Sequence, residues 1–181
     1  MKILLTAGHG GKDPGNTANG RKESDIAINL RNIVASKLRA KGFVVETDGT
    51  KSENYSLVDV LKMKFTNRLC IEIHTNAGSP QAKGVETIGV KSQAKLCKAI
   101  SQGIAKTIGS VVRKDQGFFD YEVWKAERFK ATGKSASLGF VRNGGIIVEA
   151  FFQSNTQELK AYDDKAWLIA EAIAVAIEEN V

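Results

Sequence analysis

The sequence predicts a single α/β domain, in which a mostly parallel central sheet of about six strands is flanked by helices on both faces. Short apolar runs alternate with longer segments of helical spacing along the whole chain. The runs hold few polar residues, as expected for strands buried on both faces of a parallel sheet. At 181 residues, with 43% hydrophobic and 25% charged residues and two prolines, the chain suits one compact domain without a linker.

The apolar runs are the expected strands. They lie at residues 2–6, 43–46, 69–74, 84–90, 138–141 and 145–149. Between the first of these strands and the first helix, residues 7–20 hold five glycines and the sequence Asp13-Pro14-Gly15, which predict a loop.

The expected helices follow from apolar residues that recur at helical spacing. They lie at residues 23–41, 55–65, 93–111 and 156–180. In the first of them Ile26, Leu30 and Val34 share one face, and Gly42 follows as a stop signal. Residues 112–136 are polar and aromatic, and we expect a loop or a cap over a site there.

The net charge of +6 favours an anionic partner, such as nucleic acid, a membrane surface or an anionic polymer. The basic residues are scattered and form no nucleic-acid motif, so nucleic acid is not the expected partner. No apolar stretch reaches about 18 residues, which predicts no membrane span, and the N-terminal apolar run is too short for a signal peptide. Cys70 and Cys97 form no Cys-x-x-Cys pair and are expected to be buried free thiols.

Four side chains are candidates for chemistry. His9 and His74 are the only histidines, and each follows an apolar run, at the edge where α/β sheets carry their ligand sites. Glu23 shares the core-facing side of its helix, where a carboxylate must be paired, protonated or bound to metal. Glu149 ends an apolar run, where an uncompensated carboxylate costs several kcal/mol.

Two histidines and one glutamate would make a catalytic zinc site with an open position, and a second glutamate could act as the base. Each residue alone also has a structural interpretation. Glu23 is compatible with a solvated acid in a first helical turn, His74 with a hydrogen-bonded core histidine, and His9 with an idle loop residue. The coincidence of four such residues at strand ends and a helix start favours the zinc site.

Four blocks of sequence span nearly the whole chain. They are residues 7–15 (AGHGGKDPG) continuing to Gly20 and Glu23, residues 73–77 (IHTNA), residues 84–87 (GVET) and residues 148–155 (VEAFFQSN). In sequence and in order, these blocks resemble the zinc-dependent N-acetylmuramoyl-L-alanine amidases of the amidase-3 type.

The resemblance implies that His9, Glu23 and His74 bind a zinc ion (Zn2+) and that Glu149 is the catalytic base. It also implies the reaction, which is hydrolysis of the amide joining the lactyl group of N-acetylmuramic acid to L-alanine in peptidoglycan. Mixed imidazole and carboxylate ligands make zinc the expected metal. Glu72 shares a strand face with His74 and is the candidate partner that orients an imidazole.

The chain departs from the family pattern at two places that touch none of the four site residues. Asp48 follows Thr47 where the family often has Arg, and Glu72 stands where it often has Ser. The latter form, with the sequence Glu-x-Phe-Phe at residues 149–152, is similar to phage and prophage endolysins.

The expected role is that of an endolysin. Without an export signal it would be made in the cytoplasm and reach the wall through a holin-type pore or on lysis, and its positive charge could hold it near anionic wall polymers. Residues 1–181 would be a monomeric catalytic domain with no separate wall-binding domain. The alternatives are a bacterial sporulation or cell-separation amidase, a zinc hydrolase for another amide, and a non-catalytic wall-binding module on the same fold.

Overall fold

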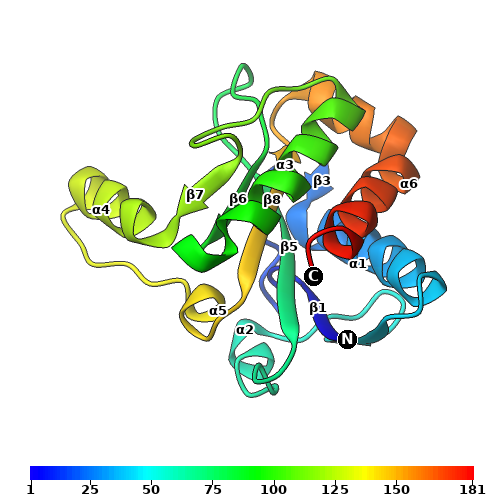
Figure 1. The fold of residues 1–181 in the computed structure, drawn as a ribbon. Coiled ribbons are helices and arrows are strands. Elements are labelled where there is room, and N and C mark those ends of the chain that lie inside the picture. The colour runs from blue at the N-terminus through cyan, green and yellow to red at the C-terminus, as the bar shows by residue number, and fades with distance from the viewer.

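A six-stranded sheet forms the centre of the protein, and the computed structural model describes all of residues 1–181 (Figure 1). The order of the strands across the sheet is β4-β1-β5-β8-β6-β7. These strands are β1 (Lys2–Ala7), β4 (Val44–Thr47), β5 (Leu69–Asn76), β6 (Glu86–Gly89), β7 (Phe118–Asp120) and β8 (Ile146–Phe152). A separate antiparallel pair is made of β2 (Thr17–Ala18) and β3 (Arg21–Lys22).

The sheet is mostly parallel, as predicted. The pairs β4–β1, β1–β5, β5–β8 and β6–β7 are parallel, and only β6 and β8 run antiparallel. The carboxyl ends of β1, β5 and β8 therefore meet at one edge of the sheet, where ligand sites of such folds form.

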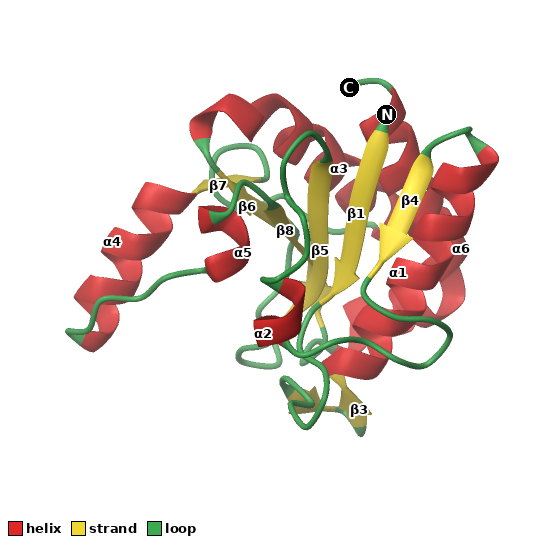
Figure 2. Ribbon diagram, turned by 90° about the horizontal axis from the view of Figure 1, so that it is seen from below, coloured by secondary structure: helices red, strands yellow, loops and turns green.

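Helices cover both faces of the sheet, with very different amounts of buried core. The helices are α1 (Glu23–Ala40), α2 (Leu57–Val60), α3 (Ala94–Ile108), α4 (Tyr121–Thr132), α5 (Gly139–Arg142) and α6 (Thr156–Glu178), with a 3-10 turn at Lys91–Gln93. On one face α1, α3 and α6 pack together over a core of 31 buried residues. The core on the other face has only nine buried residues, beneath short helices such as α5. On this side α4 projects away from the body of the protein (Figure 2).

Two predicted elements were wrong. Residues 138–141 were expected to form a strand, but α5 occupies Gly139–Arg142. One helical turn buries Phe140 and Val141 in the smaller core, and a run this short does not distinguish a turn of helix from a strand. The sixth strand is instead β7, inside the segment 112–136 that was expected to be a loop or cap and that also holds α4.

The second predicted helix is shorter than expected. The spacing suggested residues 55–65, whereas α2 spans Leu57–Val60. Ser56 caps its start, because its side chain accepts a hydrogen bond from the backbone N–H of Asp59.

Cys70 and Cys97 are buried free thiols, as predicted. Burial raises the pKa of Cys70 to about 11 and that of Cys97 to about 12. Among the helices of this structure, none combines the length and apolar character that a bilayer crossing requires.

Candidate metal centre

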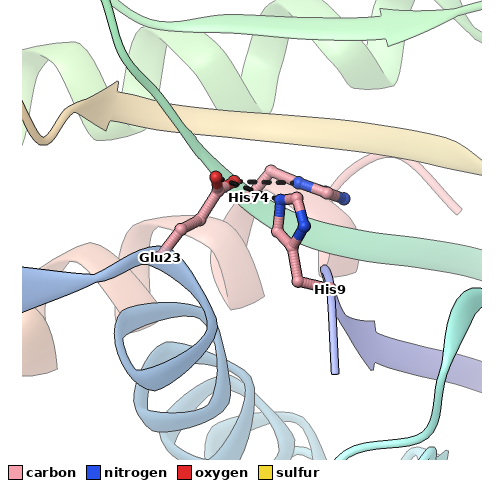
Figure 3. Close-up of side chains that lie close together, drawn as sticks. All are labelled: His9, Glu23 and His74. Atoms are coloured by element: carbon pink, nitrogen blue, oxygen red, sulfur yellow. Dashed lines mark hydrogen bonds and ion pairs between the residues drawn. The ribbon is translucent and has the colours of Figure 1, made fainter. Parts of the chain in front are cut away.

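The carboxyl edge of the sheet brings together the three predicted metal ligands (Figure 3). Since β1 and β5 are parallel, with Ala7 opposite Ile73, the loop after β1 and the end of β5 lie side by side. His9 comes from that loop, His74 from β5, and Glu23 is the first residue of α1. One possible ligand atom from each residue lies within 4.8 Å of the other two.

Glu23 lies between the two histidines. Its Oε1 is 3.0 Å from Nδ1 of His74, and its Oε2 is 3.0 Å from Nε2 of His9. The carboxylate is 1% exposed and also accepts hydrogen bonds from the backbone N–H groups of Thr75 and Asn16. Burial raises the pKa of Glu23, but the hydrogen bonds from His74 and His9 outweigh it and hold that pKa well below its usual range. Glu23 is therefore paired, as a carboxylate aimed at a core must be.

The second nitrogen of each imidazole faces another carboxylate. Nδ1 of His9 is 2.9 Å from Oδ2 of Asp13, and Nε2 of His74 is 3.2 Å from Oε2 of Glu72. Burial lowers the pKa of both imidazoles, but the carboxylates reverse this effect, so the pKa of His9 is raised and that of His74 lies well above its ordinary value. A carboxylate on the outer nitrogen is the usual arrangement for a metal-bound histidine, since it fixes the tautomer and the ring orientation.

The sequence indicated Glu72 but not Asp13. Glu72 precedes His74 by two residues in a strand, and strand geometry places both side chains on one face. Asp13 lies in a loop, where its sequence Asp-Pro-Gly has the ordinary signature of a turn. Its spacing of four residues after His9 is the only local signal for the contact.

Glu149 lies beside this cluster without belonging to it. It is opposite His74 in the parallel pair β5–β8 and opposite Glu86 in the antiparallel pair β6–β8, so all three side chains share one face. Its Oε2 is buried and has no hydrogen-bond partner. Burial, with the negative charges of Glu23 and Glu86, outweighs the nearby imidazole of His74 and raises the pKa of Glu149 to about 7.

A cavity of about 180 Å³ opens onto these groups. It has a polar side formed by the histidines and carboxylates, and an apolar side from α2, α5 and β8. Its lining residues are His9, Asp13, Leu57, Glu72, His74, Ser137, Leu138, Gly139, Phe140, Ile147 and Glu149. The segment 137–140, which was expected in part to be a strand, thus forms one wall of the site.

A close approach of backbone to ligand explains one glycine of the first block. A Cβ atom on Gly8 would lie 2.3 to 2.5 Å from three atoms of the His74 ring. The imidazole therefore rests directly on the backbone at Gly8, and any side chain there would displace it.

The donor set fits zinc. Two imidazole nitrogens and one carboxylate oxygen are the ligands of open, catalytic zinc sites. The ligands are gathered from three separate elements, both imidazoles have carboxylates on their outer nitrogens, and a carboxyl group lies beside them in the cavity. Such an arrangement can bind a metal with a position left for water or substrate.

Comparison with known proteins identifies the family of this chain. A sequence model of the Amidase_3 family, described as N-acetylmuramoyl-L-alanine amidase, matches residues 3–179. The endolysin of Bacillus phage SPP1 is 30% identical over 98% of this chain, which spans 65% of that endolysin's length.

Solved structures share the fold along the whole chain. A protein of Neisseria meningitidis assigned as an N-acetylmuramoyl-L-alanine amidase is 35% identical, with a TM-score of 0.83 over 98% of this chain and 94% of its own. The N-acetylmuramoyl-L-alanine amidase AmiC2 of Nostoc punctiforme has the same fold at 23% identity, with a TM-score of 0.72 over 99% of this chain and 96% of its own.

Proposed function

This chain belongs to the amidase-3 family of N-acetylmuramoyl-L-alanine amidases, and on that premise we propose that it hydrolyses the muramoyl–alanine amide of peptidoglycan with the help of zinc. The observation that carries this proposal is the convergence of His9, Glu23 and His74 within 4.8 Å, next to the half-buried side chain of Glu149. The bond that the enzyme would cleave is the amide between the lactyl group of N-acetylmuramic acid and L-alanine of the stem peptide.

His9, Glu23 and His74 would hold the metal. When bound, zinc supplies a Lewis acid for the scissile carbonyl and makes water acidic enough to lose a proton near neutral pH. Asp13 and Glu72 orient the two imidazoles through their outer nitrogens.

Glu149 is the general base and then the general acid. A carboxyl group with a pKa of about 7 can accept a proton from the attacking water and return it to the leaving amine at neutral pH. Glu149 lines the cavity, and no protein group holds its Oε2 by a hydrogen bond. Because the chain has all four residues that the proposed chemistry requires, we do not propose a non-catalytic wall-binding role.

The size of the cavity limits which part of the substrate it encloses. A space of about 180 Å³ fits the groups on the two sides of one amide, so the glycan strand and the rest of the stem peptide extend outside it. The apolar side, formed in part by Leu57 and Leu138, suits the methyl groups of the lactyl unit and of L-alanine.

The test is mass spectrometry of the products released from purified peptidoglycan. We expect free stem peptides that begin with L-alanine, their loss when a chelator is added, and their return when zinc is restored. The Glu149→Ala variant is the matched control, since it should release none. A zinc-replete wild-type protein that releases no such peptides would refute the proposed reaction, whereas cleavage of another amide would point to a different substrate.

We further propose that the enzyme acts as an endolysin. Support comes from the 30% identity with the SPP1 endolysin along nearly the whole chain and from the net charge of +6, which suits anionic wall polymers. The protein would accumulate in the cytoplasm and reach the wall once the membrane is opened. The alternative is a bacterial amidase of sporulation or cell separation with the same chemistry.

Expression in Bacillus cells separates these roles. We expect culture turbidity to stay constant until a pore-forming agent opens the membrane and then to fall rapidly, with no fall for Glu149→Ala. Separation of cell chains without lysis would favour the bacterial amidase.

A further inference from the structure

The loop between β4 and α2 lies against the backbone of residues 7–10, which carries His9. We propose that Arg31, Asp48 and Asn54 are positioning residues that hold this backbone, and through it His9, in the geometry that binds the metal. The inference rests on the proposed role of His9 as a zinc ligand, and it assigns a task to three residues outside the site.

Asp48 connects the loop to the strand that leads to His9. Its Oδ1 accepts a hydrogen bond from the backbone N–H of Ala7 at 3.1 Å and another from Nη1 of Arg31 at 2.7 Å. Both charged side chains are 0% exposed. A fully buried ion pair is often no more stable than apolar residues of the same size, so stability alone does not account for it. Its distinctive effect here is to fix the N–H group two residues before His9.

Asn54 holds the next stretch of the same backbone. Its Nδ2 lies 3.5 Å from the carbonyl oxygen of Ala7, 3.2 Å from that of Gly8 and 3.3 Å from that of His9. The amide has two N–H donors, which these three successive carbonyls share. Asn54 therefore fixes the direction of the chain on both sides of the Cα of His9.

The backbone at this point needs external support. His9 has a φ of +67° and Gly10 a φ of +115°, both in the left-handed region. A Cβ atom on Gly10 would lie 2.4 Å from the carbonyl oxygen of Tyr55, so the two loops are in direct contact. A non-glycine residue in this conformation persists only when its surroundings impose it.

Helix α1 carries both Glu23 and Arg31, so it contacts both the ligand cluster and the supporting loop. It begins with Glu23, which belongs to the ligand cluster, and Arg31 follows eight residues later, about 12 Å along the helix. Nη2 of Arg31 also donates to the carbonyl oxygen of Glu53 at 2.9 Å, next to Asn54. One rigid helix thus places Glu23 directly and places His9 through the loop.

The test compares the zinc affinity of Asn54→Ala with that of a control at the end of β4, immediately before the same loop. The control is Thr47→Val, which removes a hydroxyl that donates to the carbonyl oxygen of Gly49 at 2.8 Å. Zinc affinity is measured on purified metal-free protein by competition with a chromophoric chelator, and thermal unfolding of the metal-free protein is recorded for each variant. We expect Asn54→Ala to bind zinc at least about tenfold more weakly, and Thr47→Val to bind like the wild type.

The outcomes are distinguishable from failure of the proposed function. Wild-type protein that binds no zinc would overturn the metal site itself and, with it, this inference. Wild-type protein that binds zinc while Asn54→Ala binds equally well would overturn the positioning role alone. Equal losses of affinity in Asn54→Ala and Thr47→Val, in step with their unfolding temperatures, would also overturn it, because they would indicate general loosening of the loop.

Asp48→Asn provides a second, independent variant. It keeps an acceptor for the N–H of Ala7 but leaves the charge of Arg31 without its partner. We expect weaker zinc binding with a larger loss of stability than for Asn54→Ala. Unchanged zinc affinity in a folded Asp48→Asn protein would remove Asp48 and Arg31 from the set.

Discussion

Replacement of Glu149 by Gln should change how the stability of the metal-free protein depends on pH. The pKa of Glu149 is raised from an ordinary 4.5 to about 7, chiefly because the group is buried. The folded state therefore binds this proton more tightly than the unfolded state does. The resulting stabilisation is fully present at low pH, below the unfolded pKa, and it is lost as the pH rises from about 4.5 to about 7.

The magnitude follows from the two pKa values. At about 1.4 kcal/mol per pH unit, the ionised carboxylate of Glu149 costs the folded state about 3 kcal/mol above neutral pH. Between pH 5 and pH 8 the wild-type protein should lose about 2 to 3 kcal/mol of unfolding free energy through this one group. The Gln variant cannot ionise and should not lose it. Any constant penalty for burying the amide cancels when the two pH values are compared.

The assay is urea unfolding of both proteins in the presence of chelator at pH 5 and pH 8. We expect the stability of Glu149→Gln relative to wild type to rise by about 2 to 3 kcal/mol from the lower pH to the higher. Glu179→Gln, at an exposed position just after the last helix, provides the baseline. A relative stability of Glu149→Gln that stays constant with pH would refute the reasoning that this carboxyl group is uncompensated.

The other predictions concern the site and the thiols. Glu149→Ala should abolish turnover and leave zinc bound, which metal analysis after gel filtration checks; an active variant would exclude Glu149 as the base. His74→Ala should lose both zinc and activity, and full metal occupancy would remove His74 from the ligand set. Gly8→Ala should weaken zinc binding about tenfold in a chelator competition, because its Cβ would overlap the His74 ring. Cys70 and Cys97 should react with iodoacetamide at pH 8 at least about 100-fold more slowly than a free thiol until the protein is unfolded, since burial raises the pKa of both; mass spectrometry follows the labelling.

Much of this architecture could be predicted, because a parallel sheet separates apolar strands from amphipathic helices clearly along the chain. The same pattern located the candidate site. His74 and Glu149 each follow an apolar run. Glu23 lies on the core-facing side of its helix, where a carboxylate must be paired, protonated or bound to metal. In each case a polar residue conflicts with the apolar pattern around it, and such a conflict can be recognised from the sequence alone.

The parts that could not be predicted depend on contacts between distant segments. The run at 138–141 is compatible with either a strand or a helical turn, and only the small core under α5 decides. Asp13 has the local signature of a turn and gives no sign that it faces His9. Asp48 and Arg31 are polar residues on different elements, and nothing in either neighbourhood predicts that both are fully buried against each other.

The unequal cores of the two faces explain why the sheet can carry an uncompensated group. On the face that bears the site, Cys70 and Ile147 are apolar, but two residues further along their strands stand Glu72 and Glu149. In both β5 and β8, therefore, core residues give way to site residues within the same strand. This happens at the edge of the sheet where the short helices leave a cavity. The opposite face holds the larger core, with 31 buried residues against nine. Glu149 is not part of that core. Burying its carboxylate therefore lowers the free energy of unfolding without disrupting the packing that holds the strands in place.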